Sequence, residues 1–241
     1  MLLPKAKRVF IDMEKFESIF SRALDRKGGE TALLRLLSPP LDNKELIKLP
    51  DDYILAEFCK KIFQSGFVWR VVEQKWEGFQ EVFWGFSVDK LIMMPDDLLE
   101  KKASDPAIIR NFTKVKSIRE NAIFFREIQD EFGSFSKWIA DWDSSEIVDL
   151  WLALKLKGSR LGGNTGPYAL RAIGKDTFLL SRDVEAYFRS YKLIDGGLTT
   201  KKNLKIIQES FNTWKSESQY SYKELSQIVA FSCGDNYLFE G

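Results

Sequence analysis

The segment Leu161-Gly162-Gly163-Asn164-Thr165-Gly166 combines three glycines with two side chains that can donate hydrogen bonds. Glycine lets a backbone approach a ligand without a clash at Cβ, and successive N–H groups in a turn form a concave site for anions. Arg160 adds a positive charge directly before this glycine turn. The composition is typical of a phosphate-binding site. A tight corner between two helices would look the same, so both interpretations stay open.

Composition excludes several reaction schemes. The chain has no histidine, which removes the Ser-His-Asp and Cys-His arrangements in their usual form and any histidine-ligated zinc. Cys59 and Cys233 are too few for a disulfide framework or a zinc cluster, which favours a reducing compartment. No apolar run approaches the roughly 20 residues that cross a bilayer, and the first residues make a poor secretory signal. A cytoplasmic protein without membrane attachment is expected.

Aromatic side chains gather between Phe67 and Trp84. Trp69 and Trp76 are seven positions apart and would share one face of a helix. Aromatic faces stack on nucleic-acid bases with about 1–3 kcal/mol per base. Such a stripe is more often ordinary core, however, and we favour the core interpretation for Trp76 and Trp84.

Charge is sorted by segment although the formal net charge is only +1. Residues 101–119 and 155–175 are basic, whereas residues 127–149 are acidic. Lys157, Arg160 and Lys175 near the glycine turn would suit a phosphate backbone. Helical faces of one sign are also common in proteins that bind no nucleic acid, so charge alone does not decide.

Apolar spacing predicts helices throughout and no β-strand of useful length. Ser181 is expected to cap one helix, and Pro106 and Pro167 are expected to start two others. The expected fold is all-α, with about ten helices and no internal repeat. The predicted helices cover residues 13–26, 31–37, 51–65, 67–80, 107–129, 135–142, 145–157, 167–173, 182–191, 203–216 and 222–231, with a further one from Pro95.

Two groups of residues resemble known DNA repair enzymes. Gly166-Pro167-Tyr168 with the residues to Ile173 resembles the second half of the helix–hairpin–helix motif of DNA glycosylases, with Leu161 and Gly163 in its first half. Upstream segments are similar in order and spacing to the 3-methyladenine DNA glycosylase I family. These segments are Gln64-Ser65-Gly66-Phe67-Val68-Trp69, Phe83, Ile108-Ile109-Arg110-Asn111, Lys114, Ile118 and Asn121-Ala122, and the resemblance runs from about Asp51 to Tyr187.

The resemblance implies a helix–hairpin–helix glycosylase-like fold in two lobes and damaged DNA as the partner. It implies a monofunctional enzyme of base excision repair that flips out an alkylated purine, such as 3-methyladenine, and hydrolyses its N-glycosidic bond with water. It also implies that the glycine turn can hold a monovalent cation. The implied base-pocket residues are Trp69, Phe67, Lys61, Trp76 and Tyr168, and the implied phosphate contacts are Arg160, Gly162, Gly163, Asn164, Thr165 and Gly166.

The chain departs from the family pattern at three places. Asn164 and Thr165 make two residues, not one, between the central glycines of the hairpin. The Cys/His zinc site of the best-known members is absent, so the termini must close the fold by packing. Lys61 stands eight positions before Trp69, where the family has a base-reading glutamate. A cation there would repel a positively charged purine, which argues against 3-methyladenine as the substrate.

Two carboxylates are candidates for stabilising the positive charge that develops on the sugar during N-glycosidic cleavage. Asp183 falls one or two residues beyond the place where many superfamily members carry a catalytic aspartate, and capping is its simplest role. Glu73 lies four residues after Trp69 and could read a base edge in place of the lost glutamate. The lysine of bifunctional relatives has no counterpart, because the second hairpin helix holds Arg171 instead.

The expected organisation is a single functional unit that acts as a monomer. It comprises an N-terminal helical extension (1–50), a glycosylase-like core (51–200) and C-terminal helices that pack on the core (201–241). A non-catalytic protein that binds DNA structure on the same scaffold is the alternative, and Lys61 and the displaced aspartate favour it. A helical interaction protein with no salt-sensitive DNA binding is a third reading.

Overall fold

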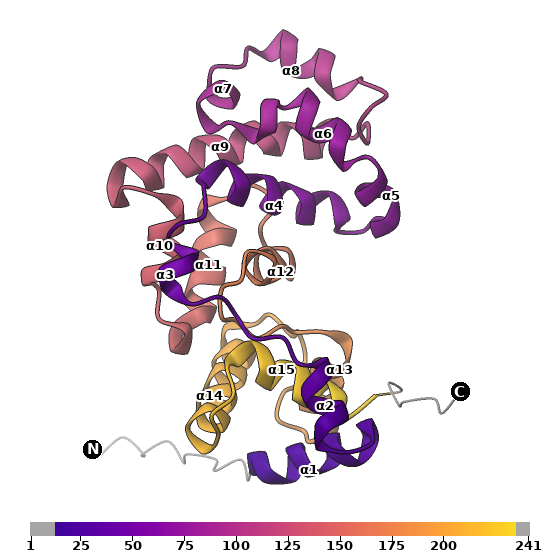
Figure 1. Ribbon diagram of the computed structural model, residues 1–241. Helices are drawn as coiled ribbons and strands as arrows, with labels where there is room; N and C mark the ends of the chain where they lie inside the picture. The colour runs from indigo at the N-terminus through magenta and orange to yellow at the C-terminus, as the bar shows by residue number, and fades with distance from the viewer. Residues whose placement is uncertain (1–12, 235–241) are drawn as a thin grey trace, which may run out of the picture. The chain divides into compact units, whose positions relative to one another are not determined.

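A computed structural model of the chain describes residues 13–234 (Figure 1). In this range every regular element is helical, with fifteen α-helices and two short 3₁₀ helices. The predicted all-α fold is confirmed. The helices outnumber the roughly ten expected from periodicity, because one predicted helix is divided in two and short helices such as Asn43–Leu46 and Val88–Ile92 were not predicted. None of the helices within residues 13–234 has the length and apolar character needed to cross a bilayer.

The chain forms two compact units, which we name by their place in the sequence. These units are defined by contacts within the structure. The predicted functional domains, with boundaries near residues 50 and 200, stay a prediction. Residues 1–12 of the expected N-terminal extension lie outside the described part of the chain. Among the described residues, the central unit comprises Ser38–Leu179 and Ser221–Glu224, and the terminal unit comprises residues 13–37, 180–220 and 225–234.

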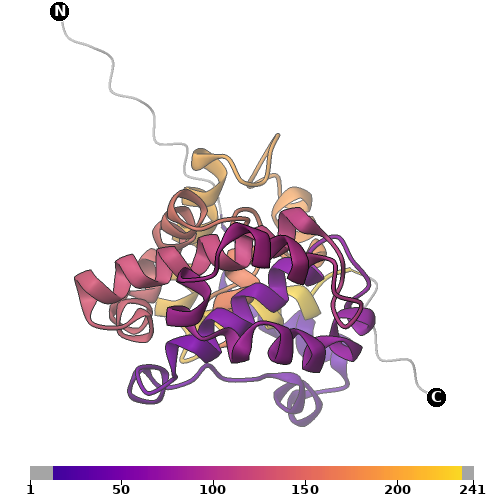
Figure 2. The ribbon, with the colours of Figure 1, turned by 90° about the horizontal axis from the view of Figure 1, so that it is seen from above.

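The central unit is built on α4 (Asp51–Gln64) and α9 (Phe112–Phe132), which pack against each other (Figure 1). Figure 2 shows the long α9 from above. Helices α7 and α8 pack on α9, and α12 packs on α4 and α11. The other helices of this unit are α3 (Asn43–Leu46), α5 (Trp69–Gln74), α6 (Trp76–Val82), η1 (Trp84–Phe86), α7 (Val88–Ile92), α8 (Asp96–Ala103), α10 (Phe135–Asp141), η2 (Ser144–Glu146), α11 (Ile147–Lys157) and α12 (Thr165–Ala172).

Phenylalanines fill the core between α4, α9 and α10. The Phe58 ring meets Phe125 and Phe135 edge to face, with ring centroids 5.8 and 5.7 Å away. Asp51 then fixes the start of α10, because its carboxylate accepts hydrogen bonds from the backbone N–H of Phe135 and of Ser136 at 2.8 and 2.9 Å. The acidic residue at the start of α4 therefore caps a neighbouring helix.

Three predicted helices have different bounds. The helix expected over residues 67–80 is two helices that meet at Lys75. The helix expected from Pro106 begins at Phe112, because the Asn111 side chain accepts a hydrogen bond from the backbone N–H of Lys114 at 3.1 Å. The helix expected to start at Pro167 begins two residues earlier, at Thr165. At α9, side-chain capping by Asn111 thus outweighed the start signal of Pro106.

The terminal unit contains helices from both ends of the chain. Its α13 begins where the sequence predicts, because the Ser181 hydroxyl accepts a hydrogen bond from the backbone N–H of Val184. Gly28 ends the first helix in the left-handed region, at φ 77°. The helices of this unit are α1 (Phe16–Lys27), α2 (Glu30–Leu36), α13 (Arg182–Ser190), α14 (Lys201–Glu217) and the greater part of α15 (Tyr222–Phe231).

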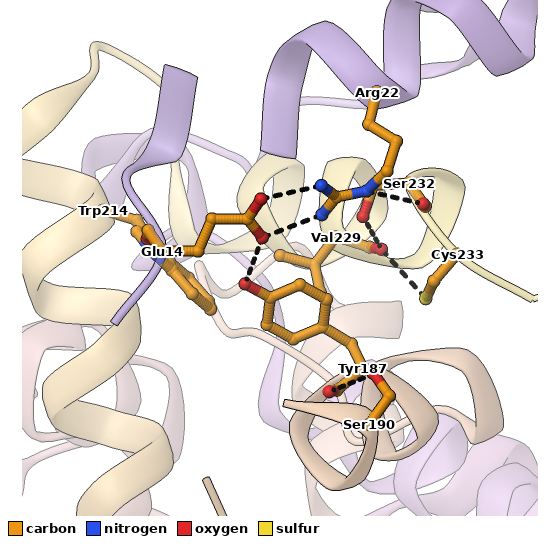
Figure 3. Close-up of polar contacts among 8 residues, drawn as sticks. All are labelled: Glu14, Arg22, Tyr187, Ser190, Trp214, Val229, Ser232 and Cys233. Carbon is orange, nitrogen blue, oxygen red and sulfur yellow. Dashed lines mark hydrogen bonds and ion pairs between the residues drawn. The ribbon is translucent and has the colours of Figure 1, made fainter. Parts of the chain in front are cut away.

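A cluster around Glu14 joins the two ends within the terminal unit (Figure 3). The Glu14 carboxylate accepts two hydrogen bonds from Arg22, at 2.7 and 2.9 Å, and one from the Tyr187 hydroxyl at 3.0 Å. The Trp214 indole N–H donates to the Glu14 carbonyl, and Arg22 Nε donates to the carbonyl of Ser232. Packing and hydrogen bonds thus close this unit, and no cluster of metal-ligating side chains occurs among residues 13–234.

Candidate functional site

A pocket of about 340 Å³ opens in the central unit. Its volume lies at the lower end of the ~300–1,000 Å³ typical of small-molecule sites. The pocket brings together residues that are a hundred positions apart in sequence and that the resemblance assigned to two different tasks. Its lining comes from the end of α4 and the following turn (Lys61, Gln64, Ser65, Gly66), from α5 (Trp69), from the glycine turn (Gly162, Gly163, Asn164, Thr165) and from α12 (Tyr168).

Trp69 and Tyr168 form the aromatic part of the lining. Their rings meet edge to face, with centroids 6.0 Å apart and planes at 89°. Trp69 is the first residue of α5 and is 51% exposed, so a large part of its ring faces solvent. A purine base could stack on such a face, and the perpendicular Tyr168 would limit where the base slides.

Lys61 is the charged residue of the lining. Its ammonium donates a hydrogen bond to Gln64 Oε1 at 2.8 Å and lies 5.0 Å from the centre of the Trp69 ring. Burial lowers the pKa of Lys61 from its ordinary value, an effect that neighbouring Lys60 reinforces and that Glu57 and Glu73 oppose. The pocket therefore holds a cation that is already in contact with its main aromatic face.

Gln64 and Glu73 hold Lys61 in place. Gln64 is 2% exposed, and its Nε2 donates to Glu73 Oε1 at 2.8 Å. The second carboxylate oxygen of Glu73 pairs with Lys60 Nζ at 2.6 Å. Because Glu73 accepts from the amide nitrogen, the amide oxygen of Gln64 is turned toward Lys61. Glu73 itself does not line the pocket and reaches it only through Gln64.

The glycine turn forms the other wall. Gly163 has φ 59°, a conformation that favours glycine, and a Cβ at Gly166 would lie 2.7 Å from the carbonyl oxygen of Leu161. The backbone N–H groups of Thr165 and Gly166 are used inside the turn. Among the described residues, Gly162 and Gly163 donate their N–H groups to no backbone carbonyl. This arrangement suits an anion, which is one of the two interpretations that the sequence leaves open.

Two buried polar residues position the walls, and sequence reasoning assigned no role to either of them. Asn121, fully buried, accepts from the N–H of Ser159 at 2.8 Å and donates to its carbonyl at 3.0 Å, which fixes the chain just before the glycine turn. Lys114 Nζ donates to the carbonyls of Phe63 and Ser65 at 3.2 and 2.7 Å, which closes the end of α4. Both residues, like Gln64 and Gly66, belong to the segments that carried the family resemblance, and that was the available signal.

Other predicted site residues lie outside the lining. Phe67 is 45% exposed in the turn before α5. Trp76 stacks between Phe79 and Phe86, with centroids 5.2 and 5.3 Å away, in agreement with its core interpretation. Arg160 is exposed and lines a second recess, of about 330 Å³, that shares Ser65, Gly162 and Thr165 with the pocket.

Two charged residues have surroundings that the sequence did not reveal. Asp183 belongs to the terminal unit, in the first turn of α13, where its backbone carbonyl accepts from Cys233 Sγ at 3.1 Å. Lys175 was expected to add charge for a phosphate backbone. It is instead 1% exposed and donates to the carbonyls of Ala140 and Trp142, so it holds the end of α10.

The all-α fold, with a glycine turn that shares a pocket with an aromatic wall, is a helix–hairpin–helix DNA glycosylase-like fold. The fold is similar to that of the 8-oxoguanine glycosylase/lyase of Methanocaldococcus jannaschii, solved in complex with a 15mer DNA containing 8-oxoguanine. That similarity covers 92% of this chain and 100% of the other, at a TM-score of 0.54 and 13% sequence identity.

Residues 48–155 of this chain match the sequence profile of the methyladenine glycosylase family. Solved structures of 3-methyladenine DNA glycosylase I are also similar. One from Staphylococcus aureus matches 63% of this chain and 91% of its own at a TM-score of 0.48 and 20% identity. Another matches 56% and 81%, at a TM-score of 0.44 and 22% identity. The predicted family resemblance and the predicted enzyme class, a DNA glycosylase, are confirmed.

Proposed function

We propose that the protein removes an alkylated purine from damaged DNA by turning the nucleotide into the pocket of the central unit and hydrolysing its N-glycosidic bond. One observation carries the proposal: Trp69 and the glycine turn line the same pocket. A base that stacks on Trp69 therefore keeps its own backbone phosphates near the N–H groups of Gly162 and Gly163.

Binding supplies much of the catalysis in this proposal. Stacking on Trp69 offsets the cost of taking the base out of the duplex, a few kcal/mol that is smallest for damaged bases. Lys157 and Arg160 are exposed beside the glycine turn, so DNA binding weakens as salt rises. The entire lining comes from one unit of one chain, which fits a monomer. Free cysteines at Cys59 and Cys233 fit action in the reducing cytoplasm.

Neither candidate carboxylate for stabilising the sugar cation belongs to the pocket lining. Glu73 is engaged with Gln64 and Lys60. A carboxylate that is neutralised by a lysine is a poor stabiliser of a second cation. We propose Asp183 for this role on the resemblance to the superfamily's catalytic aspartate alone.

Base release from DNA treated with dimethyl sulfate, resolved by chromatography, tests the function. Trp69→Ala is expected to slow release about 10- to 100-fold, because one stacking face is lost, while bulk DNA binding stays. Trp69→Phe keeps an aromatic face and should retain much of the activity. Trp142→Ala is the matched control, since Trp142 lies in the same unit but outside the lining.

Unchanged base release by a folded Trp69→Ala protein would show that the pocket takes no part in the mechanism.

In the same assay, Asp183→Asn is expected to lower the rate at saturating DNA about 100- to 1,000-fold without changing DNA affinity. A rate within a few fold of the native protein would exclude Asp183 as the stabilising carboxylate.

A further inference from the structure

We infer that Lys61 is the specificity-determining residue of this enzyme, and that it selects an alkylated purine that is neutral and presents a hydrogen-bond acceptor over one that is positively charged. The inference rests on the proposed function and names its substrate class. It follows from the charge of the pocket, from the way Lys61 is held, and from the place of its ammonium against Trp69.

The charge of the lining favours a neutral base. The residues that line the pocket within the described chain include one lysine and no carboxylate. A cationic base bound there would meet a like charge with no opposite charge in contact with it. In a partly buried site, where charges are poorly screened, such a pair is strongly disfavoured.

The orientation of Lys61 is fixed by a chain of polar contacts rather than by chance. Glu73 is anchored by Lys60 at 2.6 Å and accepts from Gln64 at 2.8 Å. Gln64, buried at the C-terminal end of α4, presents its amide oxygen to the Lys61 ammonium at 2.8 Å. A reversed amide would place two donors against the lysine, so the contacts with Glu73 and Lys61 determine each other.

Lys61 keeps donors for a ligand. An ammonium group has three N–H donors, and Gln64 takes one of them. The remaining donors belong to a side chain that lines the pocket beside the Trp69 face. An acceptor on the edge of a base stacked on Trp69 would gain a charge-assisted hydrogen bond, the strongest class available to a neutral ligand.

The Trp69 face strengthens the discrimination. The Lys61 ammonium already occupies the electron-rich side of this ring at 5.0 Å. A cationic purine would compete for the same attraction and bring two positive charges to one face. A neutral purine adds its own stacking on Trp69 without bringing a second positive charge close to Lys61.

The test compares release of neutral 1,N6-ethenoadenine with release of cationic 7-methylguanine and 3-methyladenine from oligonucleotides that each hold one lesion. The native protein is expected to favour the neutral base by at least about tenfold in kcat/KM, after correction for spontaneous loss. Lys61→Glu should reverse the order, and Lys61→Gln should reduce the preference. Lys90→Glu, with the same change of charge on an exposed residue of α7 outside the lining, should leave it unchanged.

A binding experiment separates this inference from the proposed function. Two oligonucleotides are compared that carry a 2′-fluoro sugar at one position, which makes the N-glycosidic bond resist cleavage. One has cationic 7-methylguanine at that position and the other has neutral guanine, so they differ in the methyl group and its charge. The native protein should bind the neutral form more tightly, and Lys61→Glu should prefer the cation. The same ratio in both proteins overturns the inference. Absence of any base release, with this ratio shifted as expected, overturns the proposed hydrolysis and leaves the selectivity in place. Borohydride trapping of Lys61 on DNA would also overturn the inference, since the lysine would then be a nucleophile.

Discussion

The Glu73 carboxylate reaches the pocket only through Gln64. This indirect contact determines how a substitution of Glu73 should change the kinetics of base release. It accepts from Gln64 and pairs with Lys60, and its side chain is half exposed. These contacts make it a positioning residue for Lys61, although its distance in sequence from Trp69 also suits a base-reading role. The two roles predict different kinetics.

Glu73→Gln should weaken the discrimination between neutral and cationic bases while the rate on the preferred base stays within a few fold. A glutamine can still accept from Gln64 but loses the ion pair that holds it, so Lys61 becomes less well oriented. Base release from the two lesion classes measures the ratio. Glu209→Gln, an exposed carboxylate of α14, is the control for charge. A loss of 100-fold or more on every substrate would instead make Glu73 a catalytic group.

At the scale of elements, the glycine turn has a shape that only particular residues permit. A Cβ at Gly166 would lie 2.7 Å from the Leu161 carbonyl, whereas a Cβ at Gly163 would meet open space but require φ 59° from alanine. Alanine at Gly166 would therefore push the backbone of the turn apart, whereas alanine at Gly163 would cost about 1 kcal/mol of backbone strain. Asn121 holds the approach to the turn through Ser159.

Gly166→Ala should therefore lower DNA affinity and flatten its dependence on salt, because the turn opens and loses phosphate contacts. Gly163→Ala should have a smaller effect in the same direction. Fluorescence anisotropy with a short duplex at several salt concentrations measures both quantities. Gly197→Ala is the control, since this glycine belongs to the terminal unit and its Cβ would meet only Thr200, at 3.3 Å. If the dependence of DNA affinity on salt were unchanged in a folded Gly166→Ala protein, the turn would be only a structural corner between two helices.

The sequence predicted elements whose signals are local. Ser181 caps α13 as expected, because the serine and the amide that it binds are three positions apart. The start of α9 was wrong by five residues, because the asparagine cap at Asn111 competed with the proline signal at Pro106. Lys175 was assigned to the surface because its charge is local information, whereas its burial against Ala140 and Trp142 depends on the packing of distant helices.

The same limit applies to the site. Residue types predicted a base pocket at Trp69 and an anion site at the glycine turn, but not that they share one pocket. The relay from Lys60 through Glu73 and Gln64 to Lys61 needs four side chains in fixed orientations. Spacing along a helix suggests which of them share a face, and only tertiary packing determines which atoms meet.

At the scale of the whole molecule, only the charged side chains that remain exposed in the fold can contact DNA phosphates. The chain carries a net charge of +1, and two cations of its basic segment 155–175 serve the interior. Lys175 is buried, and Arg171 donates to the carbonyls of Thr177 and Lys223. The exposed positive charge beside the glycine turn is thus limited to Lys155, Lys157 and Arg160. A few phosphate contacts, rather than a broad basic surface, should set the salt dependence.

The closure of the terminal unit depends on a carboxylate and therefore on pH. Burial alone would raise the pKa of Glu14, but hydrogen bonds from Arg22 and Tyr187 and the charge of Arg22 outweigh burial and hold it below its ordinary value. A carboxylate with a lowered pKa binds fewer protons in the folded state than in the unfolded state. Its contribution is fully present above the unfolded pKa of about 4.3 and is lost as pH falls through the lowered value.

Glu14→Gln should accordingly cost about 1.5–3 kcal/mol of unfolding free energy at neutral pH, the range for hydrogen bonds to a charged group, and almost nothing in strong acid. Urea unfolding at a series of pH values, followed by tryptophan fluorescence and circular dichroism, measures this difference. The native and variant curves should converge as pH falls below the ordinary carboxylate range. Glu17 is a nearby exposed carboxylate on α1. The Glu17→Gln variant should show the same dependence of unfolding free energy on pH as the native protein. Parallel curves for the native protein and Glu14→Gln over the whole range would show that packing around Trp214 and Tyr187, and not the ion pair with Arg22, closes the terminal unit.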